Sequence, residues 1–102
     1  MSTYNITISS DLEPLIPRYL DNRKADIERL TASLAEGKID DIRALGHTLK
    51  GSGTSFGLDA ISTFGRELED AAKASNTVQI QRVINDLATF LARVEITFVD
   101  EA

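Results

Sequence analysis

The stretch Leu45–Gly57, LGHTLKGSGTSFG, decides how this chain is organised. It contains the chain's only histidine, His47, and it places Gly46, Gly51 and Gly53 within eight residues of an otherwise helical pattern. A glycine in a helix interior costs roughly 1 kcal/mol relative to alanine. We infer that these glycines clear space around a reactive imidazole and let neighbouring helices approach closely.

A helix from about Ile39 to Phe56 is expected around this stretch, because apolar residues recur along one of its faces. At about 100° per residue, Leu45 and Leu49 fall roughly 160° from His47, so the imidazole is expected to point into solvent. The side of the helix that carries the imidazole also carries short or cationic side chains, namely Arg43, Ala44, Lys50, Gly51 and Thr54.

This arrangement suits a nucleophile that receives a dianionic group. A neutral imidazole is nucleophilic, and it is the main form of an ordinary histidine side chain at pH 7. Lys50 and Arg43 would counter the charge of an arriving phosphoryl group, and Gly51 would leave access to His47 open. The residues therefore predict a catalytic His47, a charge-neutralising Lys50 and a Gly51 that provides access.

Plainer interpretations stand beside this one. A lone histidine on a helix surface is usually only a solvated side chain, and Lys50 could simply lie exposed beside Thr54. Gly46 and Gly53 fall on one flank of the helix, about 20° apart on the wheel. That flank could receive a partner surface or serve helix packing alone.

The N-terminal part of the chain is expected to form two helices after an extended lead-in over residues 1–9. Ser10 and Glu13 read as a capping box for a short helix over about Asp11–Ile16. A longer helix should run from Pro17 to Ala35, with an apolar stripe on one face and charged residues over much of the rest. Gly37 should end it.

Two more helices are expected in the C-terminal half. The first should run from Leu58 or Asp59 to Ala74, with its acidic residues on a solvated face. The second should run from Thr77 to Val99, capped by Asn76 with Gln79. The sequence therefore predicts an all-α fold, an antiparallel up-down four-helix bundle with a short extra N-terminal helix, in a single domain over residues 1–102.

Composition narrows the class of function. Apolar residues make up 42% and charged residues 26% of the 102 residues, as is usual for a globular protein. The chain has no cysteine, which rules out disulfides and thiolate metal sites. It has neither the roughly 20-residue apolar run of a membrane span nor a signal peptide, so a cytoplasmic location is the default expectation. A net charge of −5 argues against a nucleic-acid partner.

The segment His47-Thr48-Leu49-Lys50-Gly51, followed by Gly57 and by LDAISTFGRELEDAAK, resembles the histidine-containing phosphotransfer (HPt) domain of multistep phosphorelays. The resemblance extends from about Leu15 to Val94. It implies a four-helix bundle in which His47 is phosphorylated, Lys50 lies near the phosphoryl group and Gly51 gives access. Lys38 departs from the aspartate or asparagine cap that often precedes the active helix in this family.

The same resemblance implies which partner the chain has and which catalytic groups that partner supplies. The phosphoryl donor and acceptor would be aspartates in receiver domains of response regulators or hybrid kinases, and those domains would carry the Mg²⁺. The chain itself would need no cofactor or metal and would have no kinase activity, and a monomer is expected. The surface around His47 would bind the receiver, through residues such as Arg43, Ala44, Thr48 and Thr54.

The leading hypothesis is thus a phosphohistidine carrier between receiver aspartates. The alternative is a non-catalytic helical adaptor that binds a receiver domain or another helical partner through the glycine-flanked face. A small-ligand sensor is the weakest hypothesis, because nothing in the sequence builds a polar pocket.

Overall fold

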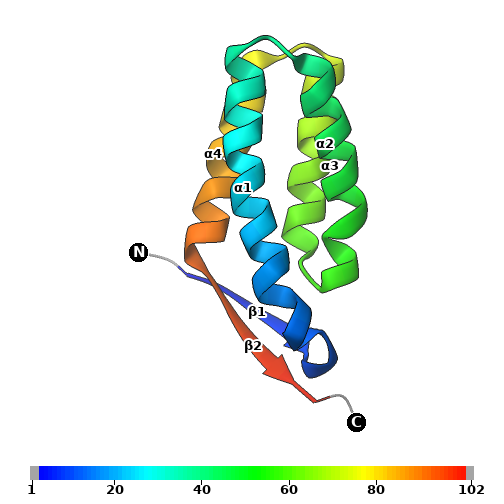
Figure 1. The fold of residues 1–102 in the computed structure, drawn as a ribbon, viewed down its shortest axis with the longest axis vertical. Helices are drawn as coiled ribbons and strands as arrows, with labels where there is room; N and C mark the ends of the chain where they lie inside the picture. The colour runs from blue at the N-terminus through cyan, green and yellow to red at the C-terminus, as the bar shows by residue number, and fades with distance from the viewer. Residues whose placement is uncertain (1–2, 101–102) are drawn as a thin grey trace.

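The computed structural model describes residues 3–100, so residues 1 and 2 of the predicted lead-in lie outside the described part. Four α-helices lie side by side along the long axis of the molecule, and two short strands cross one end (Figure 1). In chain order the elements are β1 (Tyr4–Ser9), the 3-10 helix η1 (Ser10–Leu15), α1 (Ile16–Ala35), α2 (Ile39–Ser52), the 3-10 helix η2 (Thr54–Phe56), α3 (Asp59–Lys73), α4 (Thr77–Arg93) and β2 (Val94–Val99).

Local signals account for several helix ends. Gly37 has a φ of 72°, a left-handed conformation that glycine adopts without strain, and the chain leaves α1 there. The Asn76 side chain accepts a hydrogen bond from the Gln79 backbone N–H at 3.1 Å and so caps α4. These two predictions are confirmed, and so is the mainly helical character of the chain.

The predicted N-terminal capping box is wrong. The hydroxyl of Ser9, not Ser10, accepts from the Asp11 backbone N–H at 3.3 Å, and the short helix is a 3-10 helix. Ser10 instead donates to the Asp100 carboxylate at 2.6 Å. The contact between Ser10 and Asp100 joins the two ends of the chain, which a local pattern does not reveal.

The helix that carries His47 is shorter than predicted. It ends at Ser52, and residues Thr54–Phe56 form the separate 3-10 helix η2. The Gly53 carbonyl accepts hydrogen bonds from the backbone N–H groups of both Phe56 and Leu58, at 3.1 and 2.9 Å. This double acceptance tightens the chain into a turn, which Gly57 completes with a φ of 75°.

The predicted continuation of the last helix to Val99 is also wrong. The helix ends at Arg93, and β2 pairs in parallel with β1, from Tyr4 opposite Val94 to Ser9 opposite Val99. Side chains of β2 alternate between half-buried and exposed, which places Ile96 on the inner face. The apolar spacing of this segment fits a helix or a strand equally well, and the partner strand at the other end of the chain decides between them.

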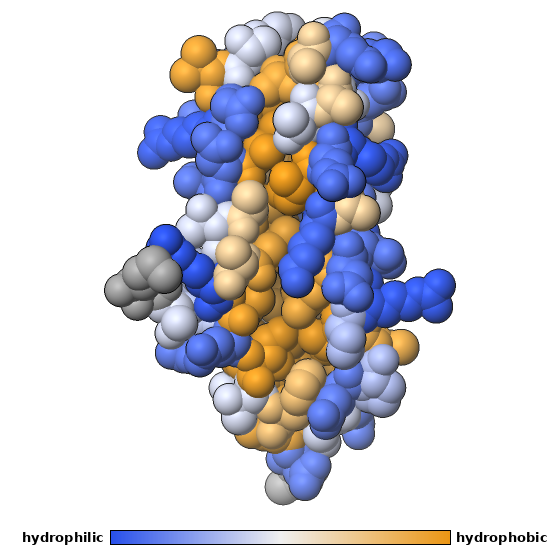
Figure 2. All heavy atoms as spheres, turned by 60° about the vertical axis from the view of Figure 1, so that its left-hand side comes forward, coloured by the Kyte–Doolittle hydropathy of each residue, from blue (hydrophilic) through white to orange (hydrophobic). Residues whose placement is uncertain are grey.

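The core lies between the four helices, and its largest fully buried side chains are Phe90, Leu30, Ile42, Leu49, Leu58, Ile61, Leu68, Ile80, Leu87 and Val83. Helix α2 packs most extensively against α3 and only lightly against α1. On the side where α1 and α4 lie, hydrophobic side chains form a band between hydrophilic margins (Figure 2). Within residues 3–100, no helix has the length and apolar content that crossing a bilayer would require.

Candidate functional site

His47 stands on the exposed side of α2, as the helical wheel predicts, with 69% of its side chain accessible to solvent. Its Nδ1 atom lies 2.9 Å from Oε2 of Glu69 on α3. The imidazole is therefore exposed but held in one orientation by a hydrogen bond from the neighbouring helix.

Glu69 is the residue that organises the site, and the sequence interpretation missed it. Its side chain is only 8% exposed, whereas the acidic residues of this helix were predicted to be solvated. The second carboxylate oxygen, Oε1, accepts a hydrogen bond from Nζ of Lys50 at 2.8 Å. One carboxylate thus binds both His47 and Lys50. A sequence signal existed, because Glu69 lies one turn after Gly65 and next to Leu68, at the margin of the apolar stripe of α3.

The electrostatics keep Glu69 ionised. The hydrogen bond from Lys50 is the main cause that lowers the pKa of Glu69 below its ordinary value of 4.5. The hydrogen bond from His47 acts in the same direction, and together they outweigh the desolvation that burial imposes. An ionised carboxylate can only accept hydrogen bonds, so the shared proton belongs to Nδ1 of His47. In the neutral imidazole this leaves Nε2 with a free lone pair.

Three glycines bring α2 and α3 close enough for this contact. A Cβ atom on Gly46 would lie 2.8 Å from the Glu69 backbone nitrogen, and one on Gly53 would lie 2.5 Å from that of Ser62. A Cβ on Gly65, in α3, would overlap the Lys50 backbone nitrogen. The flank of Gly46 and Gly53 is therefore filled by α3, which settles the two alternatives in favour of helix packing.

Gly51 differs from these glycines because it faces open space. A Cβ atom there would have no neighbour within 4 Å, and the residue is exposed. It lies one turn after His47 on the same helix, so the absence of a side chain leaves the approach to the imidazole clear.

The predicted partner-binding residues separate into two groups. Arg43, Ala44 and Thr48 line one shallow hollow together with His47 and Glu69. Thr54 lies apart, in a neighbouring hollow that Lys50 also lines, and its backbone N–H and hydroxyl both bond to the Ser62 hydroxyl, at 2.8 and 3.1 Å. The structure therefore brings three of the four predicted contacts to the imidazole and ties the fourth to α3.

Among residues 3–100, no three His, Asp or Glu side chains gather in a way that could hold a metal ion. The expectation that the chain uses no cofactor stays a prediction.

A comparison with protein families agrees with the four-helix fold and the position of His47. The family model of the Hpt domain matches residues 15–96, which is most of the chain. A search of the curated proteins and a search of the solved structures each gave no match to this chain. Because the matched segment includes all four helices and the His47 site, the chain belongs to the Hpt domain family, whose role is histidine phosphotransfer in a phosphorelay.

Proposed function

We propose that this protein carries a phosphoryl group on Nε2 of His47 between aspartates of receiver domains. The observation that supports this most directly is the hydrogen bond between Nδ1 and the buried Glu69 carboxylate. It directs the free lone pair of the imidazole to Nε2, in a side chain that is 69% exposed.

In the transfer step, the Nε2 lone pair attacks the phosphorus atom of an aspartyl phosphate on the receiver. A P–N bond forms as the P–O bond to the aspartate breaks, and the freed carboxylate stays on the receiver. Positive charge develops on the imidazole during this attack, and the Glu69 carboxylate at Nδ1 stabilises it. The reverse step returns the phosphoryl group to another receiver aspartate.

Lys50 and Gly51 have supporting roles in this proposal. The Lys50 side chain is 41% exposed and its ammonium group is bonded to Glu69, so rotation of this flexible side chain would bring the ammonium group to the phosphoryl oxygens. Gly51 leaves space for the incoming aspartyl phosphate. The receiver would supply the Mg²⁺ and the remaining catalytic groups, and this chain would act without enzymatic activity of its own.

The proposal extends to the organisation of the protein. Residues 1–102 would form one domain that acts as a cytoplasmic monomer and meets the receiver with the surface around His47. The receiver-binding surface is supported by three residues that are exposed and share a hollow with the imidazole, namely Arg43, Ala44 and Thr48.

Phosphotransfer to His47 can be tested by incubating the protein with a phosphorylated receiver domain and Mg²⁺. We expect an acid-labile, base-stable label on the wild-type protein and none on His47→Gln, which retains a polar side chain at this position. Equal labelling of the two proteins would refute the proposal. Receiver binding that survives His47→Ala, with no label on the wild type, would instead support the adaptor.

Gly51→Leu tests the access role. We expect the transfer rate to fall about tenfold or more, because a branched side chain would obstruct the approach to Nε2. The fold should persist, since the new side chain points into open space. Circular dichroism and transfer kinetics should be measured together, with Gly51→Ala as the control of smaller volume. A Gly51→Leu protein that unfolds would assign Gly51 to packing instead.

A further inference from the structure

A polar hollow of about 300 Å³ lies where the end of α2 meets the start of α3. This volume is at the small end of the range for ligand sites. The hollow shares no lining residue with the one that contains His47. Its lining consists of charged and hydroxyl-bearing side chains only, namely Lys50, Thr54, Asp59, Ser62, Thr63 and Arg66. Such a lining favours a small polar ligand that can satisfy these groups.

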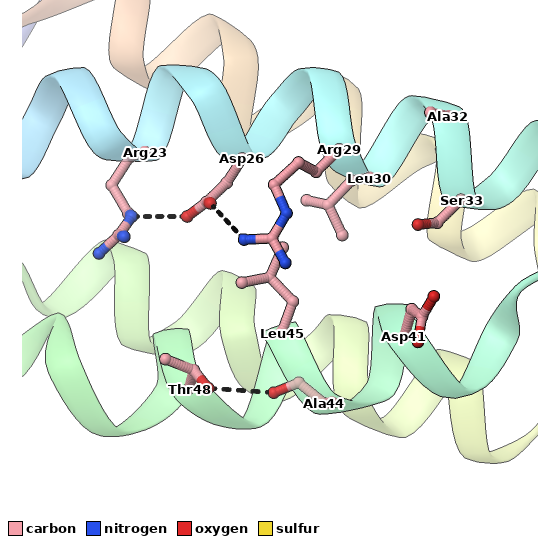
Figure 3. Close-up of a pocket in the computed structure, with 10 residues that line it drawn as sticks. All are labelled: Arg23, Asp26, Arg29, Leu30, Ala32, Ser33, Asp41, Ala44, Leu45 and Thr48. Atoms are coloured by element: carbon pink, nitrogen blue, oxygen red, sulfur yellow. Dashed lines mark hydrogen bonds and ion pairs between the residues drawn. The ribbon is translucent and has the colours of Figure 1, made fainter.

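Arg66 differs from the arginines of the groove between α1 and α2. In that groove, Arg23 and Arg29 both bond to the Asp26 carboxylate, at 2.8 and 3.5 Å (Figure 3). Arg66 is exposed, and within residues 3–100 its guanidinium forms no hydrogen bond or ion pair. A guanidinium has five N–H donors, so all five donors of Arg66 are available to a ligand.

Lys50 brings a second cation to the hollow and connects it with the proposed phosphotransfer site. Its Nζ atom donates a hydrogen bond to Oε1 of Glu69 at 2.8 Å. An ammonium group has three N–H donors, so two of them remain when one is bonded to Glu69. Lys50 can therefore bind a ligand in the hollow without releasing the carboxylate.

The Ser62 hydroxyl adds a neutral donor. Its oxygen accepts hydrogen bonds from the backbone N–H and the hydroxyl of Thr54, at 2.8 and 3.1 Å, which uses both lone pairs. Its own proton is then left to donate, and no acceptor within the described residues takes it. The two contacts with Thr54 hold this hydroxyl in position between α3 and η2.

The charges and donors of the lining favour an oxyanion. Lys50, Arg66 and the exposed acidic residue Asp59 together leave one positive charge in excess, in a chain whose net charge is −5. Ammonium, guanidinium and hydroxyl groups are donors that suit the oxygens of a phosphate ion. The hollow is thus a local exception to the acidic character of the chain.

We propose that this hollow binds inorganic phosphate through Arg66, Lys50 and Ser62, and that the bound ion restrains Lys50. The second part rests on the proposed function, in which Lys50 rotates toward the phosphoryl group on His47. Once the ammonium group is bonded to both Glu69 and a phosphate ion, this rotation breaks two contacts instead of one. Phosphate would therefore slow phosphotransfer without occupying the imidazole.

An NMR titration with sodium phosphate at constant ionic strength tests the site, with sodium chloride as the matched salt. It uses the unphosphorylated protein and does not depend on phosphotransfer. The wild type is compared with Arg66→Gln, with Asp59→Asn and with Arg82→Gln, a control at an exposed position on α4. We expect saturable shifts at the backbone amides of Thr54 and Ser62 and at Nε–H of Arg66.

We expect Arg66→Gln to raise the dissociation constant of phosphate about fivefold, because a charge-assisted contact is lost. Asp59→Asn should lower it about threefold, because the repulsion between the carboxylate and the anion is removed. A damaged fold would not produce this gain in affinity. Arg82→Gln should stay within about 1.5-fold of the wild type. Shifts that sodium chloride reproduces would overturn the site, and so would equal phosphate affinities of Arg66→Gln and Arg82→Gln.

The restraint of Lys50 is tested by the rate of transfer from a phosphorylated receiver. Phosphate that saturates the wild type should slow its transfer about twofold or more, and should slow Arg66→Gln much less. Equal slowing of the two proteins would overturn the restraint while leaving the phosphotransfer function in place. A wild-type protein that no receiver labels would refute the proposed function and the restraint with it, whereas the phosphate site would still be decided by the titration.

Discussion

The two flanks of α2 are built in opposite ways. Toward α3, Gly46, Gly53 and Gly65 place no side chain of their own at the crossing, so the backbones of the two helices lie against each other. Toward α1, the contact is light, and the long side chains of Arg23 and Arg29 line an open groove. The first flank sets the position of Glu69 and hence of the imidazole ring, whereas the second leaves an open groove beside the hollow that contains His47. A phosphotransfer helix needs both properties, because in-line transfer requires a fixed nucleophile and an accessible partner surface.

A mutation in the closely packed flank, between α2 and α3, should change the free energy of unfolding most. Gly65→Ala should lower the free energy of unfolding by about 2–4 kcal/mol, because the new methyl group would overlap the Lys50 backbone, which cannot move without separating the helices. Urea unfolding measures this loss. Gly51→Ala is the matched control and should raise the free energy of unfolding by roughly 0.5–1 kcal/mol, since it faces open space at the end of a helix. A Gly65→Ala protein as stable as the wild type would mean that this crossing is not tight.

A mutation in the open flank, between α2 and α1, should change the free energy of unfolding less. Asp26→Asn should lower the free energy of unfolding by about 1–2 kcal/mol, because the mostly buried Arg23 loses its carboxylate but retains a hydrogen-bond acceptor. Glu28→Gln, an exposed neutralisation on the same helix, serves as the control and should change little. A loss larger than that of Gly65→Ala would reverse the ranking of the two flanks.

The smallest expected effect is a change in how the stability of the fold depends on pH, and it tests the Glu69 carboxylate. Because the pKa of Glu69 is lower in the folded protein than its ordinary value of 4.5, its interactions with Lys50 and His47 stabilise the fold above that value. This contribution is lost as the pH falls through the folded pKa. We therefore expect the stability of Glu69→Gln to depend less steeply on pH below about 4.5 than that of the wild type.

Thermal unfolding between pH 3 and pH 7 measures this difference in slope. Lys50→Met supplies an independent check, because it removes the main cause of the lowered pKa of Glu69 and should also flatten the profile. Parallel profiles for the wild type and Glu69→Gln would show that the carboxylate contributes nothing that depends on its charge.

Some features of this protein follow from the sequence alone because they depend on neighbouring residues. Helical periodicity places His47 opposite Leu45 and Leu49, and the side chain is indeed exposed. Gly37 and Asn76 mark helix ends through backbone and capping preferences that act within a few residues. The motif from His47 to Gly51, with Gly57 and the helical segment that follows, predicts the family, which the match over residues 15–96 confirms.

Other features were decided only by tertiary structure, because they join segments that are far apart in the chain. Val94–Val99 becomes a strand because β1 is available to pair with it. Asp26 and Glu69 look like ordinary surface acids in the sequence, but each is buried where a neighbouring helix and nearby cations enclose it. Gly46 reads equally well as a docking surface or a packing position until the backbone of α3 is seen to occupy the space. Periodicity shows which side of a helix is buried, but only the packed structure shows what lies against it.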